Sequence, residues 1–127
     1  MKELLLVSIG SFFGGGVRFM VSKYIQAVVG MMFPLGTMAV NIAGCFVIGL
    51  LSGLNWKGGM LMQPATKLLL TTGFCGGFTT FSTFMNEGTS LLKNGNTMML
   101  SLYVFGSIAL GFVAVIAGQQ VAKMLQA

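Results

Sequence analysis

The sequence predicts an all-α membrane protein with four transmembrane helices, the third of which is broken near its middle. Of the 127 residues, 55% are hydrophobic and only 7% are charged, whereas a soluble domain averages about 25% charged residues. A transmembrane helix needs about 20 apolar residues, so four of them with short connections account for nearly the whole length. One apolar run is interrupted by glycines and hydroxyl side chains. We therefore expect a single membrane domain over residues 1–127.

The first helix is expected over residues 4–29. Arg18 lies near its middle, and the apolar stretch before it is too short to cross a bilayer alone. Either the span is short and Arg18 reaches the membrane surface together with Lys23, or the helix is longer and Arg18 faces the protein interior or a water-filled vestibule. The longer helix is favoured. Gly10 and Gly14 lie one turn apart and permit close approach of another helix.

The second helix is expected over residues 35–54, after a turn at Pro34, because proline disfavours helical geometry in the residue before it. Asn41 is the one strongly polar side chain in this segment. An amide at that depth is costly unless it is hydrogen-bonded. From the residues alone, a hydrogen bond between helices and contact with a ligand explain Asn41 equally well. Gly49 and Gly53 add another small-residue face.

Residues 55–67 are predicted to form a loop, in which Trp56 and Lys57 suit the membrane–water interface. The third helix is expected over residues 68–92, broken between Gly76 and Thr80. Residues 73–84 read Gly-Phe-Cys-Gly-Gly-Phe-Thr-Thr-Phe-Ser-Thr-Phe. In lipid every backbone N–H and C=O must find a partner, so such an interruption is stable only inside protein or beside a wet cavity. We interpret it as a broken helix at an ion site, with Gly77 at a close backbone approach.

The fourth helix is expected over residues 97–125, after a polar turn at residues 93–96. Tyr103, Ser107 and Gly111 recur at four-residue steps within it. Side chains at this spacing share one face of a helix. The fourth helix therefore carries a short polar face.

The charges give only a weak signal for orientation in the membrane. Four helices would place Lys2, Lys57, Lys67 and Lys123 on one side, and Lys23 and Lys93, together with Arg18, on the other. Such a balance permits both orientations, so we hypothesise an antiparallel pair of chains with a two-fold axis in the membrane plane. The net charge is +5, and the positively charged residues are scattered singly along the chain. Proteins that bind a phosphate backbone carry clusters of such residues, so nucleic acid is not an expected partner.

The chemistry of the interruption suits an ion of either sign. Its hydroxyls and the Asn41 amide carry no net charge, and the edges of the Phe81 and Phe84 rings are electropositive, which together favour an anion. A helix break also exposes carbonyl groups that coordinate small cations. The residue types alone do not choose between the two.

No energy source is visible in the sequence. It has no His, no Walker A pattern and no pair of carboxylates, and Glu87 is the one acid near the middle of the chain. A proton-coupled exporter is expected to carry a carboxylate within the membrane. We therefore expect passive conduction and no enzymatic activity.

The chain resembles the Fluc (CrcB) family of fluoride channels over essentially its full length. Residues 73–84 match the signature of the third helix of that family. Supporting matches are Arg18 in the first helix, and Gly36-Thr37 followed by Val40-Asn41 in the second. The resemblance implies a dual-topology, antiparallel homodimer in the cell (inner) membrane, with multiple passes through the lipid bilayer. It also implies two fluoride pores and a central Na⁺ at the interface between the chains.

The resemblance also implies roles for individual residues. Phe81 and Phe84 would meet fluoride through their ring edges, and Asn41 would be the pore amide. The remaining assignments are Ser82 and Thr83 as hydroxyls along the pathway, Arg18 as the charge that keeps the vestibule positive, and the carbonyls of Gly76 and Thr79 as sodium ligands. Tyr103 and Ser107 fit the polar track that the family shows on its fourth helix, whereas Gly111 and Val115 continue that face without a hydroxyl.

Two alternatives belong to other classes of protein. A small four-helix multidrug-type exporter would need a membrane carboxylate in the first helix, and Glu3 is too near its end. A non-conducting membrane assembly subunit would explain the glycine faces but would leave the residues from Thr79 to Phe84 without a purpose. Anion flux through vesicles that contain only this protein discriminates between the three.

Overall fold

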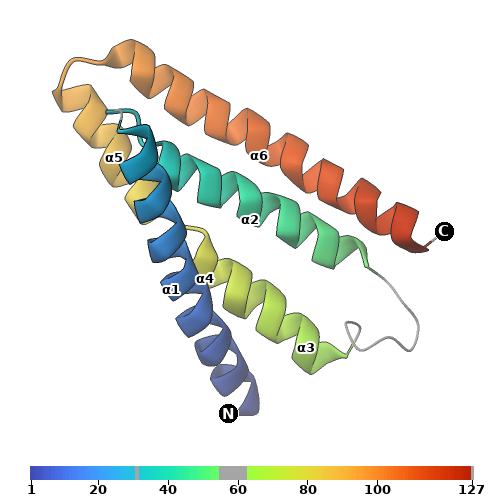
Figure 1. Cartoon of the computed structure of the whole chain (residues 1–127). Coiled ribbons are helices and arrows are strands. Elements are labelled where there is room, and N and C mark those ends of the chain that lie inside the picture. The colour runs from blue at the N-terminus through green and yellow to red at the C-terminus, as the bar shows by residue number, and fades with distance from the viewer. Residues whose placement is uncertain (31, 55–62, 127) are drawn as a thin grey trace.

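The computed structural model describes residues 1–30, 32–54 and 63–126, and every regular element in this part of the chain is a helix, without a strand. The elements are α1 (Lys2–Val29), α2 (Leu35–Gly53), α3 (Pro64–Leu68), the π-helix η2 (Leu69–Cys75), α4 (Gly76–Phe78), α5 (Ser82–Lys93) and α6 (Thr97–Gln126) (Figure 1). Among the described residues, α1, α2 and α6 are the helices long and apolar enough to cross a membrane. Trp56 and Lys57, which we predicted to lie at the membrane interface, are outside the described residues.

The third predicted helix is divided into two helical stretches. It begins at Pro64, four residues before the predicted start, so the prediction of a loop over residues 64–67 was wrong. Proline lacks an N–H, but the first position of a helix does not need one, and a proline can therefore start a helix as well as interrupt one. The first stretch ends at Phe78, Thr79 is extended (φ −91°, ψ 159°), and α5 begins at Ser82. The predicted break between Gly76 and Thr80 is confirmed.

The first stretch of this segment lies against α1 through glycines on both sides. Gly10 and Gly14 are the buried residues of α1. A Cβ atom at Gly10 would lie 2.8 Å from the Cα atom of Gly73, and a Cβ atom at Gly14 would collide with the carbonyl oxygen of Phe74. The close approach predicted from the spacing of these glycines is therefore confirmed.

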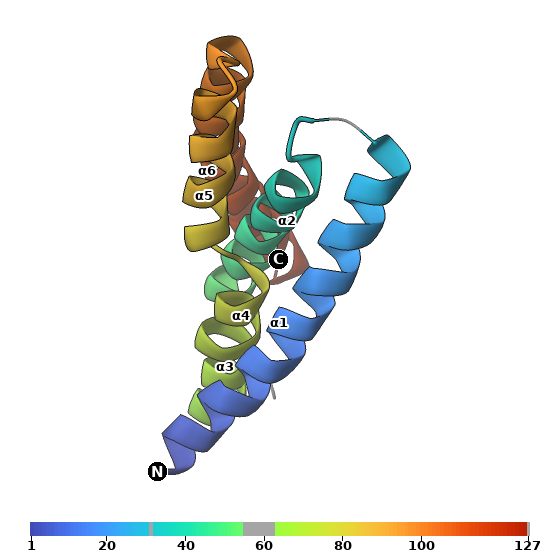
Figure 2. The same cartoon turned by 90° about the vertical axis from the view of Figure 1, so that its left-hand side faces the viewer.

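The close backbone approach expected at Gly77 is between the broken segment and α1 of the same chain. A Cβ atom at Gly77 would be 2.6 Å from the carbonyl oxygen of Ser11 and 3.1 Å from the backbone nitrogen of Gly15. Figure 2 shows α1 running beside α3 and α4 and then separating from α5 and α6. Gly77 therefore holds the inner end of the broken segment against α1.

The helices α2 and α6 lie side by side and run in the same direction (Figure 1). A Cβ atom at Gly49 would collide with the carbonyl oxygen of Val115, and one at Gly118 with the carbonyl oxygen of Phe46. A Cβ atom at Gly53 would lie 2.8 Å from the Cβ of Ala122. The small-residue face predicted for the second helix therefore packs against α6.

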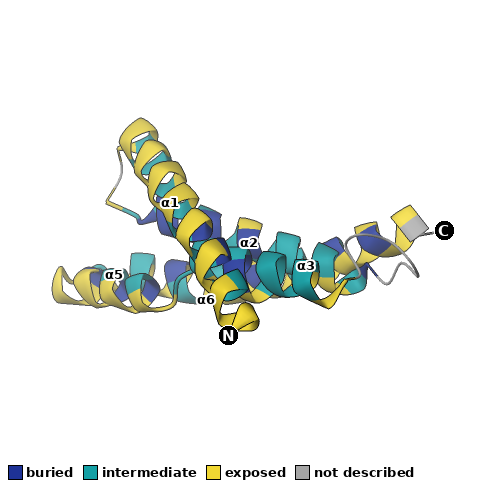
Figure 3. Cartoon of the chain, turned by 90° about the horizontal axis from the view of Figure 1, so that it is seen from below, coloured by how far each residue is buried: buried dark blue, intermediate teal, exposed yellow. Residues whose placement is uncertain are grey.

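The outer half of the broken segment, α5, forms a hairpin with α6. Gly95 closes the turn with a positive φ of 75°, and the Asn96 N–H donates to the Leu91 carbonyl over 3.0 Å. The buried core at this end combines α2, α5 and α6, and consists of Met38, Phe84, Leu91 and Tyr103. Seen from below, α1 and α5 diverge from the centre of the molecule (Figure 3). The broken segment thus contacts α1 with one half and α6 with the other.

Candidate functional site

A groove of about 600 Å³ lies between α2 and the broken segment. It is lined by Asn41, Gly44, Cys45, Ile48, Thr71, Thr72, Cys75, Gly76, Thr79, Thr80, Phe81 and Phe84. Five residues that we assigned to the site from the sequence come together here, namely Asn41, Gly76, Thr79, Phe81 and Phe84. Gly44 makes room for the break, because a Cβ atom there would collide with the side chain of Thr79.

The carboxamide of Asn41 is bonded to the main chain at the break. Its Nδ2 donates to the carbonyl oxygen of Thr80 over 3.0 Å, and the Thr80 N–H donates to its Oδ1 over 2.8 Å. Thr80 lies between two helices and has no helical partner for either group. A carboxamide has two N–H donors and two acceptor lone pairs, so one N–H and one lone pair remain. Asn41 can therefore hold the break and still face the groove.

Threonine hydroxyls satisfy two more groups around the break. The N–H and the Oγ1 of Thr79 both donate to the carbonyl oxygen of Cys75, over 3.0 and 2.9 Å. The Thr83 N–H donates to the Oγ1 of Thr80 over 3.3 Å. This second bond gives an acceptor to one N–H in the first turn of α5, where backbone N–H groups lack helical acceptors.

Two side chains of α1 donate to glycine carbonyls of the broken segment. The Ser11 hydroxyl donates to Gly73 over 3.2 Å, and the Nε of Arg18 donates to Gly77 over 3.1 Å. Arg18 is half-buried and lies at the carboxyl end of α4, where a positive charge complements the free carbonyls and the helix dipole. Arg18 therefore turns inward along the longer first helix that we favoured.

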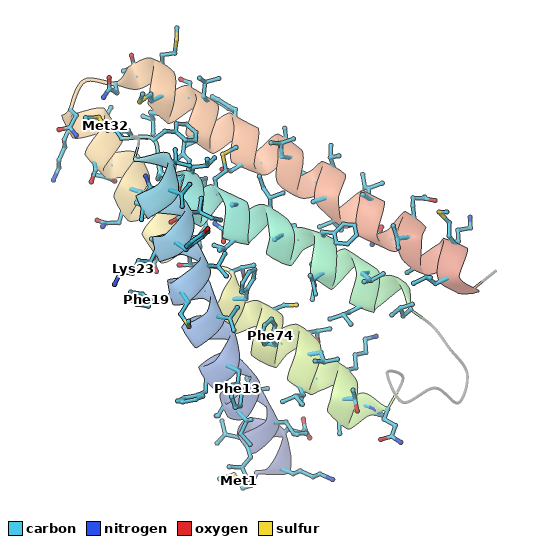
Figure 4. All side chains as sticks on the ribbon, viewed as in Figure 1. Met1, Phe13, Phe19, Lys23, Met32 and Phe74 are labelled. Carbon is cyan, nitrogen blue, oxygen red and sulfur yellow. The ribbon has the colours of Figure 1, made fainter. Side chains whose placement is uncertain are left out.

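Lys23 behaves differently from Arg18. Its Nζ lies 5.6 Å from the centre of the Phe19 ring, and both residues project from the outer side of α1 (Figure 4). An ammonium group above an aromatic face is a favourable cation–π contact. The short-helix alternative placed both Arg18 and Lys23 at the membrane surface. In the structure only Lys23 lies on the outer side of α1, whereas Arg18 contacts Gly77.

The carbonyl groups released by the break divide into two sets. Those of Cys75, Gly77 and Thr80 accept the hydrogen bonds described above. Within the described part of the chain, no hydrogen bond reaches the carbonyl oxygens of Gly76 and Thr79. Both residues line the groove. Gly76 is exposed and Thr79 is half-buried, so both carbonyl groups are open to water or to another ligand.

A ladder of aromatic rings leads from the groove to α6. Phe81 is 72% exposed, whereas Phe84 is only 8% exposed. The ring centres of Phe81 and Phe84 are 6.2 Å apart, those of Phe84 and Tyr103 are 4.9 Å apart, and Phe33 meets Tyr103 edge to face at 5.6 Å. From the sequence, Phe81 and Phe84 have the same expected role, but the two residues differ in burial. Phe84 is part of the core, and Phe81 lies at the surface of the chain.

The polar face of α6 lies next to this ladder. Tyr103 is fully buried, and its hydroxyl lies 3.4 Å from the Oε1 of Glu87 on α5. The Oγ of Ser107 is buried and has no hydrogen-bond partner among the described residues. A Cβ atom at Gly111 would lie 3.4 Å from the Sγ of Cys45 on α2. The face that Tyr103, Ser107 and Gly111 share therefore points into the protein.

Sequence reasoning missed part of the groove. Thr71 and Thr72 line it from η2, and the Thr71 hydroxyl donates to the Lys67 carbonyl over 2.6 Å. Cys45 and Cys75 also line the groove, and both are free thiols. Nothing in the spacing of residues 69–75 distinguishes a π-helix from an α-helix, so which side chains of this stretch face the groove could not be predicted.

Comparison with known proteins identifies similar sequences over nearly the whole chain. The sequence model of one family, described as "CrcB-like protein, Camphor Resistance (CrcB)", matches residues 5–119. A protein of Chlorobium phaeobacteroides (strain BS1) named "Fluoride-specific ion channel FluC" is 48% identical over 121 residues, which are 95% of this chain and 93% of that protein. Proteins with the same name from Chlorobaculum tepidum and Maridesulfovibrio salexigens are 45% and 37% identical, and the matches cover 98% or more of each chain.

Proposed function

Because this chain belongs to the CrcB-like family, whose sequence model covers residues 5–119, we propose that it is a fluoride-selective channel through which the anion leaves the cell passively. Relatives that match it over nearly their full length are named fluoride-specific ion channels. The structural observation that carries the proposal is the presentation of Phe81 in the groove beside Asn41 and Thr80. Ring edges, an amide and hydroxyls favour an anion without a fixed positive charge.

Fluoride is small and strongly hydrated, so a selective path must offer donors that replace its water. Asn41 keeps one N–H after its bond to Thr80, and this N–H would face the anion. Phe81 would contribute its ring edge from the exposed side of the break. The hydroxyls of Ser82 and Thr83, in the first turn of α5, would continue the path.

The path would then follow Phe84 toward α6. Tyr103 touches Phe84, and the Ser107 hydroxyl is four residues further along the same helix. A buried hydroxyl without a partner costs about 1–3 kcal/mol. The unpaired Oγ of Ser107 supports a role for this group in meeting the permeating anion or the water that accompanies it.

We propose that two chains form an antiparallel homodimer in the inner membrane, each crossing it with α1, α2, the broken segment and α6. The large exposed ring of Phe81 and the open groove beside it support a partner chain at the break. The weak charge bias of the sequence supports insertion in both orientations. A dimer of this kind has two equivalent pores, and export of fluoride through them would reduce its toxicity.

The unpaired carbonyls of Gly76 and Thr79 fit a structural Na⁺ at the centre of this dimer. Both line the groove, and neither accepts a hydrogen bond within the described chain. Unwound carbonyls are the usual ligands of small cations in broken membrane helices. Two such groups from each chain would hold the ion, which would supply the positive charge that the four carbonyl dipoles need.

The test is efflux from liposomes that contain the purified protein and are loaded with fluoride or with chloride. Rapid fluoride release without chloride release is expected. Equal release of both anions, or of neither, would contradict the proposal. Fluoride efflux that is unchanged by an imposed pH gradient would rule out the multidrug-type exporter, and any fluoride efflux would rule out the non-conducting assembly subunit.

The dual topology needs a separate test. In a chain whose two native cysteines are replaced by alanine, a single cysteine at Asn94→Cys, in the exposed turn after α5, is labelled with an impermeant reagent from outside intact cells. About half of the chains should react before the membrane is opened. Complete reaction or complete protection would show one orientation and exclude the antiparallel pair.

A further inference from the structure

A second cavity, of about 220 Å³, lies between the connection from α1 to α2 and the second half of α5. Met32 and Pro34 line it on one side, and Glu87, Ser90 and Asn94 line it on the other. It shares no lining residue with the groove at the break. The cavity is therefore a separate feature of the chain, and neither the conduction path nor the sodium site uses it.

Hydrogen bonds of the fold set the shape of this cavity. Gln26, which also lines it, donates from Nε2 to the Phe33 carbonyl over 3.0 Å and accepts from the Gly36 N–H over 3.1 Å. The Nδ2 of Asn96 donates to the Sδ of Met32 over 3.0 Å. The connection between α1 and α2 is thus tied to α1 at one end and to the turn before α6 at the other, so the cavity is formed before any ligand enters.

Glu87 is the one charged side chain in the cavity. It is half-buried, and its Oε1 lies 3.4 Å from the hydroxyl of Tyr103. No basic side chain of the described residues forms an ion pair with it, although the chain carries seven Lys and Arg against two acids. Carboxylates that are withdrawn from water are normally paired with a cation. A cation that enters the cavity would therefore meet a carboxylate that no basic residue of the described chain neutralises.

Neutral oxygen acceptors accompany this carboxylate. Ser90 and Asn94 follow Glu87 at steps of three and four residues, so the three share one face of α5. The Ser90 hydroxyl donates to the Asn86 carbonyl over 3.2 Å, and its own lone pairs remain available. The cavity also lies at the carboxyl end of α5, where the helix dipole favours a cation. Lys93, the basic residue of that last turn, does not line it.

We propose that this cavity binds a guanidinium ion, with room for a short alkyl substituent, and that the bound cation increases fluoride conduction. The volume corresponds to roughly seven water molecules at about 30 Å³ each, which is too large for a bare metal ion. Guanidinium is planar and weakly hydrated, and its N–H groups match a carboxylate in pairs. Its faces suit the thioether of Met32 and the ring of Pro34, and its edges suit the acceptors of α5.

The effect on conduction rests on the proposed function and on the position of Tyr103. This residue contacts Glu87 through its hydroxyl, and its ring centre lies 4.9 Å from that of Phe84, along the proposed path. A negative charge one side chain away from the path opposes entry of an anion. A guanidinium ion bound to Glu87 would cancel that charge without entering the path.

The first test measures binding. Radiolabelled guanidinium at millimolar concentration is dialysed to equilibrium against the purified protein in detergent. One saturable site per chain is expected in the unaltered protein and in Glu3→Gln, which removes the other acid from the exposed first turn of α1. Glu87→Gln should weaken binding by about 10-fold or more, because it removes a charge-assisted pair of hydrogen bonds.

A second variant keeps the carboxylate and fills the cavity. Ser90 is exposed, so Ser90→Leu should leave the fold intact and abolish binding. The absence of a saturable site in the unaltered protein, or equal binding in all of these variants, would overturn the proposal. Displacement by the same concentration of K⁺ would show a site for any monovalent cation and would overturn the assignment to guanidinium.

Binding is measured in the absence of fluoride, so it can fail while the channel proposal stands. A protein that releases fluoride but does not bind guanidinium would refute the cation site alone. A protein that binds guanidinium but releases no fluoride would refute the channel and leave the cation site.

The second test measures the effect on conduction. Fluoride efflux from liposomes is compared with guanidinium chloride on both sides of the membrane and with NaCl at the same ionic strength. Guanidinium should increase efflux roughly five-fold in the unaltered protein and in Glu3→Gln, as expected for the removal of one charge at about 10 Å in a medium between water and protein. Glu87→Gln should not respond. A decrease in the unaltered protein, or an equal response in Glu87→Gln, would show that the cation does not act through Glu87.

Discussion

The carboxamide of Asn41 and the main chain of Thr80 form a closed pair of hydrogen bonds, 3.0 and 2.8 Å long, that ties α2 to the interruption of the third segment. The residues alone left Asn41 equally suited to a contact between helices and to a ligand contact. The structure shows that the contact between helices exists, and the contact with the anion remains our proposal. Both roles are compatible, because each use occupies different donor and acceptor sites of the same amide.

Asn41→Ala is expected to impair both the fold and conduction. It leaves the N–H and the C=O of Thr80 without partners, which costs about 1–3 kcal/mol for each buried group, and it removes a pore donor. Fluoride efflux should fall at least 10-fold, and the melting temperature should fall with it. Asn94→Ala, which removes an amide from the exposed turn after α5, is the control and should change neither. Unchanged efflux in Asn41→Ala would remove this residue from the pathway.

Phe81 and Phe84 should respond differently to truncation. Phe81→Ile should abolish most fluoride efflux and leave the fold intact, because this ring is largely exposed. Phe84→Ala should destabilise the protein by about 3–5 kcal/mol, since it empties a buried site against Tyr103. Thermal unfolding in detergent and efflux from liposomes separate the two effects. Full-rate efflux in a folded Phe81→Ile variant would contradict the proposed role of its ring.

Two glycines of α1 provide a matched pair for testing helix packing. A Cβ atom at Gly14 would collide with the Phe74 carbonyl, so Gly14→Ala should destabilise the chain by about 1–3 kcal/mol or more. Gly16 has nothing within 4 Å of the same position. Gly16→Ala should be neutral or stabilising by up to about 1 kcal/mol, because alanine favours a helix more than glycine does. A reversed order of stabilities in thermal unfolding would show that α1 is packed differently.

Ser107→Ala should separate stability from function. The Oγ of Ser107 is buried without a partner in the described chain, so its removal should leave the melting temperature unchanged or raise it. If the hydroxyl meets the permeating anion, fluoride efflux should fall in the same variant. Ser101→Ala, which changes an exposed serine of α6, is the control. A drop in stability without a drop in efflux would assign Ser107 a structural role.

Sodium should stabilise the dimer if it binds the carbonyls of Gly76 and Thr79. A ligand that binds only the folded state raises the melting temperature in proportion to the logarithm of its concentration above its dissociation constant. Thermal unfolding is therefore measured in increasing NaCl, with N-methylglucamine chloride at the same ionic strength as the control. Identical melting temperatures in both salts would exclude a stabilising sodium site.

Local signals were enough to predict the helices and the position of the break. Pro34 marks the start of α2, and the glycine and hydroxyl cluster marks the interruption at Thr79. The same kind of signal failed at Pro64, because a proline that ends one helix is chemically identical to a proline that begins another. The π-helix η2 was also missed, because its pattern of side chains does not differ from that of an α-helix over so few residues.

Partners distant in the sequence could not be predicted from it. Arg18 was expected to face inward, but its acceptor lies 59 residues away at Gly77. Asn41 and Thr80 are separated by 39 residues. The different burial of Phe81 and Phe84 likewise depends on the position of Tyr103 on another helix. Such pairings follow from how the helices pack, and the sequence of one segment does not contain them.

The side chains of other helices that donate to the broken segment all precede it along the chain, and this order matters for membrane insertion. Ser11 and Arg18 belong to α1, and Asn41 belongs to α2. During synthesis these side chains leave the ribosome before Gly73, Gly77 and Thr80. The broken segment, which carries unpaired main-chain groups and a polar outer face, therefore meets helices already equipped to receive it. The broken segment can therefore enter the bilayer by packing onto α1 and α2, and it does not have to transfer from water to lipid alone.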